Sequence, residues 1–391
     1  MTVRILHVVP SIDPILGGVA ESIRVRGLEL TRLGHTVEVV SLDEPGSDVA
    51  NNFELQLHPL GKGFSKWNYS RKLYSWLSEN AGRYDAVVVD GLWQYQCYAV
   101  RAALKNSGIP YFVFPHGMLD PWFKKNSKLK HLKKWLFWPW CEYRLLKNAQ
   151  AVLFTCEEER RLAGQSFGLY TANEIVVPFG TSAPPSNGGD LSKAFLVEHP
   201  ELNKKQLVLY LGRIHPKKGC DIAIKAFANL AELYPDAVLA IAGAGDQVYV
   251  KKLKSLISGL GIEEKIVWLG MLKGDSKWGA MYAARCFVLP SHQENFGIAV
   301  VEALACGKPV VISNKVNIWK EVESSFAGFV GEDDVVDTEV NLNKVLSMQR
   351  EGYASMADAA LSVYRRRFSV SAMAAGMIDA VNIYKNGGAC E

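Results

Sequence analysis

Several features that would assign the chain to other classes of protein are missing from its sequence. Its seven cysteines are widely spaced and odd in number, and no Cys-x-x-Cys occurs. This pattern argues against a disulfide framework or a zinc site and favours reduced cysteines in a cytosolic protein. No uncharged apolar stretch reaches the roughly 18 residues that are needed to span a bilayer. The apolar run near the start lacks a small-residue cleavage site, so residues 3–9 are predicted to form a buried strand rather than a signal peptide.

A strong excess of charge is missing too. The formal net charge is +4 over 391 residues, which is too weak to indicate a nucleic-acid partner. Hydrophobic residues make up 49% of the chain and charged residues 21%, the balance of a folded globular protein rather than a disordered one. The length exceeds what one ordinary hydrophobic core accommodates, so two domains are expected.

Short β-rich runs alternate with stretches of helical periodicity through both halves of the chain. The runs predicted to be strands are 3–9, 36–42, 85–89, 110–114, 151–154 and 174–177, and then 207–211, 238–242, 265–269, 286–289 and 309–312. This alternation predicts α/β domains built from βαβ units with mostly parallel sheets. Residues 181–190 are rich in Pro, Gly, Ser and Asn, which is typical of a domain boundary. We therefore expect domains over residues 1–185 and 186–370, and a helix over 371–391 that packs back on the first domain.

Parallel sheets bind ligands at the carboxyl ends of their strands, so the residues after each strand are the candidates for a site. After the strand at 207–211, Gly212 and Gly219 enclose a turn that carries Arg213 and Lys218, five positions apart. Both side chains could reach one point above the strand end, where a planar guanidinium and a compact ammonium together suit a diphosphate. A solvated basic loop is the alternative interpretation of this turn.

Glycines follow two other predicted strands. Gly17 and Gly18 lie between the first strand and a helix, where backbone N–H groups can approach an anion. Gly243 begins a Gly-Ala-Gly-Asp turn after the strand at 238–242. Plain turns would explain both features equally, and the Gly17-Gly18 segment does not fit the Gly-x-Gly-x-x-Gly pattern of ordinary NAD sites.

The most specific pattern follows the strand at 286–289. Glu294 precedes a helix that is predicted to begin near Phe296 or Gly297, and Glu302 lies eight positions further on, within that helix. The residues around Glu302 are apolar on nearly every side, so the helix is predicted to be mostly buried. A buried carboxylate needs a partner, which is either a ligand or a salt bridge. Paired sugar hydroxyls are a suitable ligand because a carboxylate accepts two hydrogen bonds.

The segment from Glu294 to Glu302, with Phe296-Gly297 inside it, resembles the Glu, seven residues, Glu signature of glycosyltransferase family 4. The members of this family are retaining enzymes that use nucleotide sugars. The resemblance covers almost the whole chain and includes Gly17-Gly18, the Arg213/Lys218 turn and the trailing 307–310 segment. It implies the GT-B fold, in which two Rossmann-like α/β domains face each other across a cleft.

The resemblance also implies roles for particular residues. Arg213 and Lys218 would hold the donor diphosphate, Glu302 would bind the ribose, and Glu294 would bind the donor sugar with the help of backbone N–H groups. The stretch 268–272 would lie against the base, and Gly17 and Gly18 would lie near the diphosphate and the acceptor. The implied donor-binding set is Gly17, Gly18, Arg213, Lys218, Gly243, Leu269, Met271, Leu272, Glu294, Asn295, Phe296, Gly297, Ile298 and Glu302.

A histidine completes the implied catalytic set. His116 lies in a Pro-His-Gly turn after the strand at 110–114 and matches a family histidine near the donor sugar. A neutral imidazole can donate or accept a hydrogen bond there, although a lone histidine after a strand can also be structural. The catalytic candidates are therefore His116, Arg213, Lys218 and Glu294.

No Asp-x-Asp occurs in the sequence, whereas metal-dependent sugar transferases of the other major fold typically hold their cation with such a pair. We therefore expect no metal ion and no other cofactor, because Arg213, Lys218 and helix dipoles can stabilise the leaving diphosphate. The resemblance implies retaining transfer of a hexosyl group from a UDP-sugar, or from a GDP-sugar as second choice. The acceptor would be a saccharide or a lipid-linked saccharide in polysaccharide biosynthesis. A non-hydrolysing sugar-nucleotide epimerase and a non-catalytic nucleotide-sugar binding protein are the alternatives.

Basic and aromatic residues interleave over residues 121–147, where Glu142 is the single acid. This mixture suits a membrane interface and favours peripheral contact with the inner face of the cell membrane. The alternative is that the aromatic side chains pack into the domain while the lysines are solvated. Pro139 supports that alternative because it interrupts a simple amphipathic helix.

Overall fold

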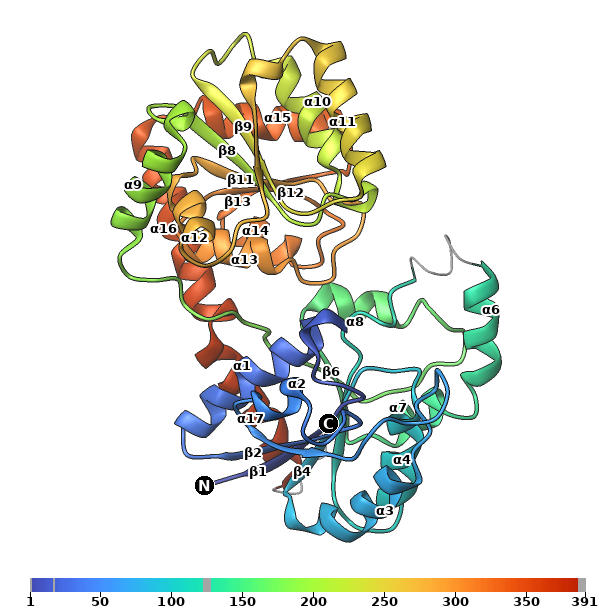
Figure 1. Ribbon diagram of the computed structural model, residues 1–391. Coiled ribbons are helices and arrows are strands. Elements are labelled where there is room, and N and C mark those ends of the chain that lie inside the picture. Colours follow the sequence, from blue (N-terminus) through green and yellow to red (C-terminus); the bar gives the residue numbers. More distant parts are fainter. Residues whose placement is uncertain (1, 17, 122–127, 386–391) are drawn as a thin grey trace. The chain divides into compact units, whose positions relative to one another are not determined.

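The computed structural model describes residues 2–16, 18–121 and 128–385. The chain divides into two compact units (Figure 1). Unit 1 comprises residues 1–180 and 370–391, and unit 2 comprises residues 181–369. The sequence-based boundaries were placed after residues 185 and 370, whereas the units divide after residues 180 and 369.

Unit 1 contains a parallel sheet of seven strands in the order β3-β2-β1-β4-β5-β6-β7. Its strands are β1 (Arg4–Val8), β2 (Thr36–Ser41), β3 (Gln56–Pro59), β4 (Ala86–Asp90), β5 (Tyr111–Phe114), β6 (Ala151–Phe154) and β7 (Glu174–Val176). Its helices are α1 (Gly18–Arg32), α2 (Asp48–Asn51), α3 (Arg71–Asn80), α4 (Tyr95–Leu104), α6 (Lys128–Phe137), α7 (Glu142–Asn148), α8 (Glu157–Ala163) and α17 (Val370–Lys385), with short 3₁₀ turns at Pro14–Leu16 and Ala81–Arg83.

Two hydrophobic layers cover this sheet because alternate residues of each buried strand point to opposite faces. In β4, Val87 and Val89 join the layer that includes Leu73 and Val100 of helices α3 and α4. Ala86 and Val88 join the opposite layer, which α1 and α17 cover. Although it comes last in the chain, α17 therefore contributes to the core of unit 1.

Unit 2 contains a parallel sheet of six strands in the order β10-β9-β8-β11-β12-β13. Its strands are β8 (Gln206–Leu211), β9 (Ala237–Ala242), β10 (Ile266–Gly270), β11 (Cys286–Leu289), β12 (Val310–Ser313) and β13 (Gly328–Gly331). Its helices are α9 (Gly188–Glu198), α10 (Cys220–Leu230), α11 (Gln247–Leu260), α12 (Gly274–Ala283), α13 (Ile298–Ala305), α14 (Trp319–Ser324), α15 (Val335–Leu346) and α16 (Arg350–Val363), which continues as a π-helical turn at Tyr364–Phe368. Short 3₁₀ turns lie at Pro200–Leu202, Pro216–Lys218 and Glu263–Lys265.

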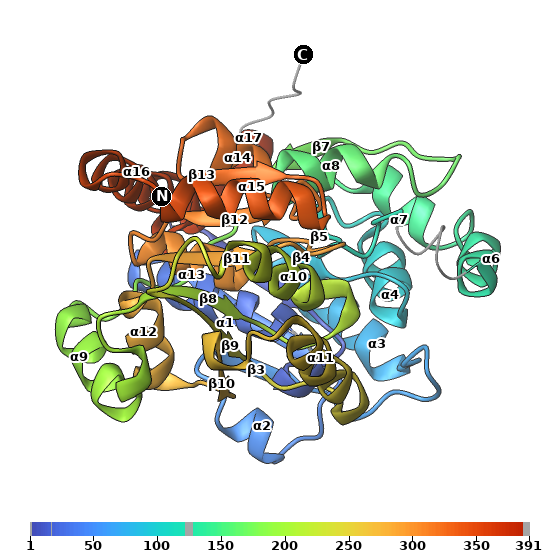
Figure 2. The same cartoon turned by 90° about the horizontal axis from the view of Figure 1, so that it is seen from above.

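Helices lie on both sides of the second sheet as well. Helix α9 packs against α12, and α10 packs against α15 (Figures 1 and 2). The strand order reverses direction between β8 and β11, so the loops after these two strands diverge to opposite faces. Such a reversal is where doubly wound sheets bind their ligands. The two sheets confirm the predicted α/β fold of two doubly wound domains.

Two edge strands were not predicted from the sequence. Strand β3 ends in a proline and has no fully buried residue, and β13 begins and ends with glycine. Among the described residues, no helix is both long enough and apolar enough to cross a bilayer.

Candidate active site

The turn after β8 is held against the loop after β11 at the carboxyl edge of the second sheet. Gly219 has a φ of 64°, and a Cβ atom there would lie 2.0 Å from the carbonyl oxygen of Pro290. Only glycine permits this close approach, which places the two loops in contact. His292 then donates its backbone N–H to the carbonyl of Lys217 at 2.9 Å, and Lys217 Nζ donates to Gln293 Oε1 at 3.0 Å.

Lys218 and Glu294 form an ion pair across these loops. The backbone of Glu294 is fixed on both sides, because its N–H donates to the Lys315 carbonyl and its carbonyl accepts from Asn317. Burial, with the neighbouring cations Arg213 and Lys217, lowers the pKa of Lys218 to about 8. The structure therefore brings together two of the predicted site residues.

Glu302 has a different lysine partner. Its Oε1 accepts from Lys277 Nζ of α12 at 2.7 Å, while Val300, Val301 and Ala303 around it are buried. Of the two partners predicted for this carboxylate, the structure shows the salt bridge, and the role in ribose binding stays a prediction. Lys277 was not identified from the sequence.

Arg213 remains available for a ligand. Arg213 is exposed. Its guanidinium forms no ion pair with any residue in the described part of the chain. Gly243 lies beside it, with a φ of 143°, where a Cβ atom would fall 1.8 Å from the Gly212 carbonyl oxygen. The need for glycine at position 243 is thus explained by the turn itself, and its nucleotide contact stays a prediction.

The predicted base-binding stretch follows the neighbouring strand. Leu269 lies in β10 and is half-buried, as is Leu272, whereas the Met271 side chain is exposed. Gly243 donates its backbone N–H to the carbonyl of Gly270 at 2.7 Å, which ties this stretch to the turn after β9. An exposed thioether and two half-buried leucines can provide an apolar surface for a flat ring.

The helix that was predicted to begin near Phe296 or Gly297 is α13, which begins at Ile298, one or two residues later. Asn295 accepts from the side-chain amide of Asn317 at 3.3 Å, and Phe296 is buried against Phe368. No described side chain caps the first turn of α13. The amides of Ile298 and Ala299 therefore retain the capacity to bind an anion or hydroxyls, whereas the Val300 amide already donates to the Gly297 carbonyl.

In unit 1 the glycine-rich segment lies between β1 and α1. Gly18 is the first residue of α1 and is exposed, whereas Gly17 lies outside the described residues. Ser11 Oγ donates to Asp43 Oδ1 at 2.5 Å, and the Ile12 amide donates to Asp43 Oδ2 at 2.9 Å. Asp43 thus anchors the loop that leads into this segment.

His116 belongs to a buried network that the sequence did not reveal. Its Nε2 lies 2.9 Å from Asp90 Oδ1, and His7 Nδ1 lies 2.6 Å from Asp90 Oδ2. Arg26 approaches the same carboxylate at 3.5 Å and lies over the Phe114 ring. Burial alone would raise the pKa of Asp90, but the charges and hydrogen bonds of His7 and His116 hold it well below its ordinary value. Burial lowers the pKa of His7, and the Asp90 carboxylate beside it opposes that shift.

A second carboxylate, that of Glu159, also holds the Pro-His-Gly turn. Glu159 is buried and accepts from the Gly117 amide at 2.6 Å through Oε1. Through Oε2 it accepts from the amide and the hydroxyl of Thr155. His116 itself has a φ of 49°, an uncommon value for a residue with a side chain. The turn that presents His116 is therefore fixed by buried acids on two sides.

The basic aromatic segment is divided between core and surface. Trp138 is buried and stacks on Phe167 with ring centroids 4.0 Å apart, as the packing interpretation predicts. Five other large apolar side chains are exposed: Leu132, Trp135, Leu136, Phe137 and Trp140. Helix α6 lies at the periphery of unit 1 in both views (Figures 1 and 2). The residues over 122–127 lie outside the described part of the chain.

The loops after β8, β9, β10 and β11 thus form a polar, charged edge of the second sheet. An edge of this kind in an α/β protein suits a phosphate-bearing ligand. Within the described residues, no group of three or more His, Cys, Asp or Glu side chains is arranged to hold a metal ion. Two family models match the sequence: a glycosyl transferase 4-like domain over residues 17–180, and glycosyl transferases group 1 over residues 193–362. The chain belongs to the group 1, family 4-type glycosyltransferases.

Curated relatives match parts of the chain. A GDP-mannose-dependent alpha-(1-6)-phosphatidylinositol monomannoside mannosyltransferase of Mycolicibacterium smegmatis is 28% identical over 50% of this chain and 52% of its own length. A mannosylfructose-phosphate synthase of Agrobacterium fabrum is 30% identical over 37% of this chain and 34% of its own length. The matches thus span about a third to a half of these relatives.

Solved structures match along the whole chain. A crystal structure of the Anabaena protein HepE in complex with UDP has a TM-score of 0.76 and 20% sequence identity, and the match covers 97% of this chain and 99% of HepE. At this identity the likeness shows the fold, which is the two doubly wound α/β units of the GT-B class that the resemblance implied.

Proposed function

We propose that the chain transfers a hexosyl group from a UDP-sugar to a saccharide acceptor, with retention of the anomeric configuration and without a metal ion. The observation that carries this proposal is the set of charged side chains at the carboxyl edge of unit 2. Lys218 pairs with Glu294 and Lys277 pairs with Glu302, while Arg213 is exposed beside them. All four members of these pairs are partly accessible, so a ligand can replace either partner.

On binding, groups of the donor would replace one member of these ion pairs. The diphosphate takes the place of Glu294 at Lys218 and also engages Arg213, because a diphosphate carries more charge than a carboxylate. Glu294 is then free to accept hydrogen bonds from the sugar, and Glu302 accepts from the ribose hydroxyls. Lys218 and Glu294 each keep a partner before and after binding, which avoids the cost of an unpaired partly buried charge.

In the transfer step, the bond between the anomeric carbon and the diphosphate oxygen breaks, and a bond to the acceptor oxygen forms on the same face. The acceptor hydroxyl proton passes to the departing diphosphate oxygen, so the products are UDP and the glycosylated acceptor. Lys218 and Arg213 stabilise the negative charge that develops on the leaving group. Product NMR tests this step: retention is expected, and an inverted anomeric centre would contradict it.

UDP is favoured over GDP as the donor nucleotide. The HepE structures that match this fold contain UDP or UDP-glucose, while the smegmatis relative is GDP-mannose-dependent. Incubation with UDP-glucose, UDP-galactose and GDP-mannose separates the alternatives. Release of UDP that depends on an added saccharide supports transfer, whereas a new sugar nucleotide formed without an acceptor identifies an epimerase. Binding without turnover identifies a binding protein.

Activity in the presence of EDTA tests whether sugar transfer is independent of metal ions. Transfer should continue in EDTA, because cationic side chains take the role of the ion. Loss of activity in EDTA that magnesium or manganese restores would overturn this part of the proposal.

We also propose that α6 and the turn after it contact an anionic membrane, which suits a lipid-linked acceptor. Trp135, Phe137 and Trp140 are exposed, and the exposed cations Lys133 and Arg144 lie among them. Aromatic rings settle at the headgroup level while basic residues attract anionic lipids. This surface would bring the protein to the membrane without a spanning helix.

Vesicle sedimentation tests the membrane proposal. At low salt the protein should pellet with phosphatidylglycerol vesicles and remain in solution with phosphatidylcholine vesicles. A variant with Trp135→Ser and Phe137→Ser should lose most of this binding, whereas a control with Val197→Ser and Leu233→Ser, both exposed in unit 2, should keep it. Absence of binding to anionic vesicles would exclude the membrane role.

A further inference from the structure

A pocket of about 280 Å³ opens at the carboxyl ends of β1 and β4 in unit 1. Its lining is mixed. Leu16, Val19 and Met118 provide apolar surface, while Asn68, Gln94 and Gln96 provide side-chain amides. Apolar surface next to amides is the combination that binds a sugar ring, which has aliphatic faces and a rim of hydroxyls.

Two of these amides have unmet hydrogen-bonding capacity. Gln96 is only 1% exposed, yet neither its Oε1 nor its Nε2 has a partner among the described residues, and the same is true of Gln94 Oε1. Buried amides are almost always paired, because an unpaired one loses its hydration without compensation. An amide that is buried, unpaired and in a pocket wall is poised for a ligand that both donates and accepts hydrogen bonds, as a hydroxyl does.

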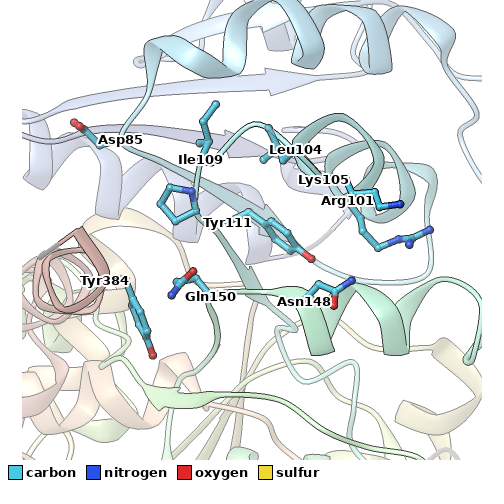
Figure 3. Close-up of a pocket in the computed structure, with 11 residues that line it drawn as sticks. Asp85, Arg101, Leu104, Lys105, Ile109, Tyr111, Asn148, Gln150 and Tyr384 are labelled. Carbon is cyan, nitrogen blue, oxygen red and sulfur yellow. The ribbon is translucent and has the colours of Figure 1, made fainter. Parts of the chain in front are cut away.

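The described lining of the pocket offers no cationic side chain that would hold an anion. Among the described residues, those in its lining that can ionise are the acids Asp13 and Asp90, and Asp90 is already paired with His7, Arg26 and His116. A second pocket in unit 1, of about 690 Å³, has the opposite character (Figure 3). Arg101 and Lys105 line one side of that pocket, at the amino-terminal edge of the sheet. Cations that could hold a phosphate thus line the larger pocket, and none of the described residues that line the smaller pocket is a lysine or an arginine.

Aromatic residues neighbour the amides of this pocket along the chain. Trp67 and Tyr69 flank Asn68, and Tyr95 lies between the two glutamines. The two segments are tied together by the Tyr95 amide, which donates to the Trp67 carbonyl at 2.8 Å. Tyr98 completes the group, with its ring centroid 5.9 Å from that of Tyr95. Tyr69 and Tyr98 are exposed residues, at 46% and 41%, so their rings can stack on a further sugar.

We infer that this pocket receives the terminal sugar of an uncharged oligosaccharide, with Gln94 and Gln96 binding its hydroxyls and the exposed tyrosines contacting the next sugar. This inference rests on the proposed function, because the bound sugar is the acceptor of that transfer. It narrows the acceptor to a neutral glycan of at least two units and excludes sugar phosphates.

Saturation-transfer NMR on the full chain with UDP present tests this inference separately from catalysis. The probes are neutral glucose, galactose and mannose disaccharides, the matching monosaccharides, and glucose 6-phosphate. A neutral disaccharide should bind better than its monosaccharide and better than the phosphate. Gln96→Leu should weaken this binding about tenfold or more, since a sugar hydroxyl loses its partner, whereas Gln56→Leu on the exposed edge strand β3 should not.

Tyr98→Ala provides a variant at an exposed position that is not expected to affect folding. It should remove the advantage of the disaccharide over the monosaccharide and leave monosaccharide binding unchanged. Tighter binding of glucose 6-phosphate, or glycan binding that is equal in wild type and Gln96→Leu, would overturn the inference. If UDP binds and no glycan does, the pocket assignment is wrong while the donor site stands. If UDP itself does not bind, the proposed function has failed.

Discussion

At the carboxyl edge of unit 2, the charged pairs are accessible: Lys218 and Glu294 are 17% and 21% exposed, and Lys277 and Glu302 are 22% and 13% exposed. At the corresponding edge of unit 1, the side chains of His7, Arg26 and Asp90 are completely buried. Both units place acids and bases where their strands end, but only those of unit 2 can exchange partners with a ligand.

The difference indicates that the carboxyl edges of the two sheets have different roles. The pairs of unit 2 are each simple and partly hydrated, so a diphosphate or a ribose can replace one member at small cost. The network of unit 1 has one carboxylate surrounded by three basic side chains, and only His116, with 9% of its side chain exposed, reaches towards solvent. We interpret unit 2 as the exchanging part of the site and the buried network as a support that holds His116.

The largest expected effect comes from breaking that support. Asp90→Asn should lower the free energy of unfolding by about 3–5 kcal/mol, because it leaves the buried Arg26 charge without its partner. Urea denaturation followed by circular dichroism measures this loss. Asp48→Asn, an exposed position in α2, should change stability by less than about 0.5 kcal/mol. A loss at position 90 as small as the control would show that the network is not a structural support.

The next largest effect is expected at the accessible edge. Lys218→Ala should lower the transfer rate about 10²–10³-fold, by analogy with the loss of one donor to a developing anion. The protein should keep its stability, since Lys218 is not part of a closed network. Steady-state kinetics with the donor measures this effect. Lys225→Ala on α10, which pairs with Asp221 in solvent, is the matched control, and equal rates in the two variants would contradict the assignment of Lys218.

Glu302→Ala should weaken nucleotide binding by about 10–100-fold, which corresponds to the hydrogen bonds that a charged acceptor makes to the ribose hydroxyls. The control is Glu323→Ala, at an exposed position of α14. Titration with uridine monophosphate, UDP and 2′-deoxy-UDP would show which group of the nucleotide accounts for the lost affinity. If Glu302→Ala lowers the affinity for UDP and deoxy-UDP equally, the carboxylate does not bind the 2′-hydroxyl.

The smallest effect is a pH dependence. Because the pKa of Lys218 is lowered to about 8, the side chain is a cation below that pH and loses its charge as the pH rises through it. Since kcat/KM reports the free enzyme, its value for the donor should fall about tenfold from pH 8 to pH 9.5. Lys218→Arg should keep its charge and move this decline to higher pH. An identical alkaline limb in both proteins would assign it to another group.

The central strands could be predicted from the sequence because each is a run of residues that are buried on both sides. Residues 85–89 were predicted as a strand, and β4 is Ala86–Asp90 with every residue buried. The edge strands β3 and β13 escaped prediction because they are only half-buried and contain polar, proline or glycine residues. At such positions pairing with a neighbouring strand, rather than local composition, determines the structure.

The candidate site could be predicted only in part for a similar reason. Lys218 and Glu294 were each identified from their place after a strand, but nothing local showed that they pair across 76 positions. His7 and Asp90 are 83 positions apart, and only the sheet order brings them together. Asp90, the last residue of β4 and directly after the predicted run 85–89, was nevertheless a visible signal, because the strand end of a parallel sheet is where polar groups collect.

Calorimetric titration of UDP into the wild type, Lys218→Ala and Glu302→Ala tests the central claim most directly. The wild type should bind UDP with one site, and each variant should bind it at least about tenfold more weakly while its folding is unchanged. Equal affinity in all three proteins, or no binding of UDP or GDP to a folded wild type, would show that the charged edge of unit 2 is not a nucleotide-sugar site.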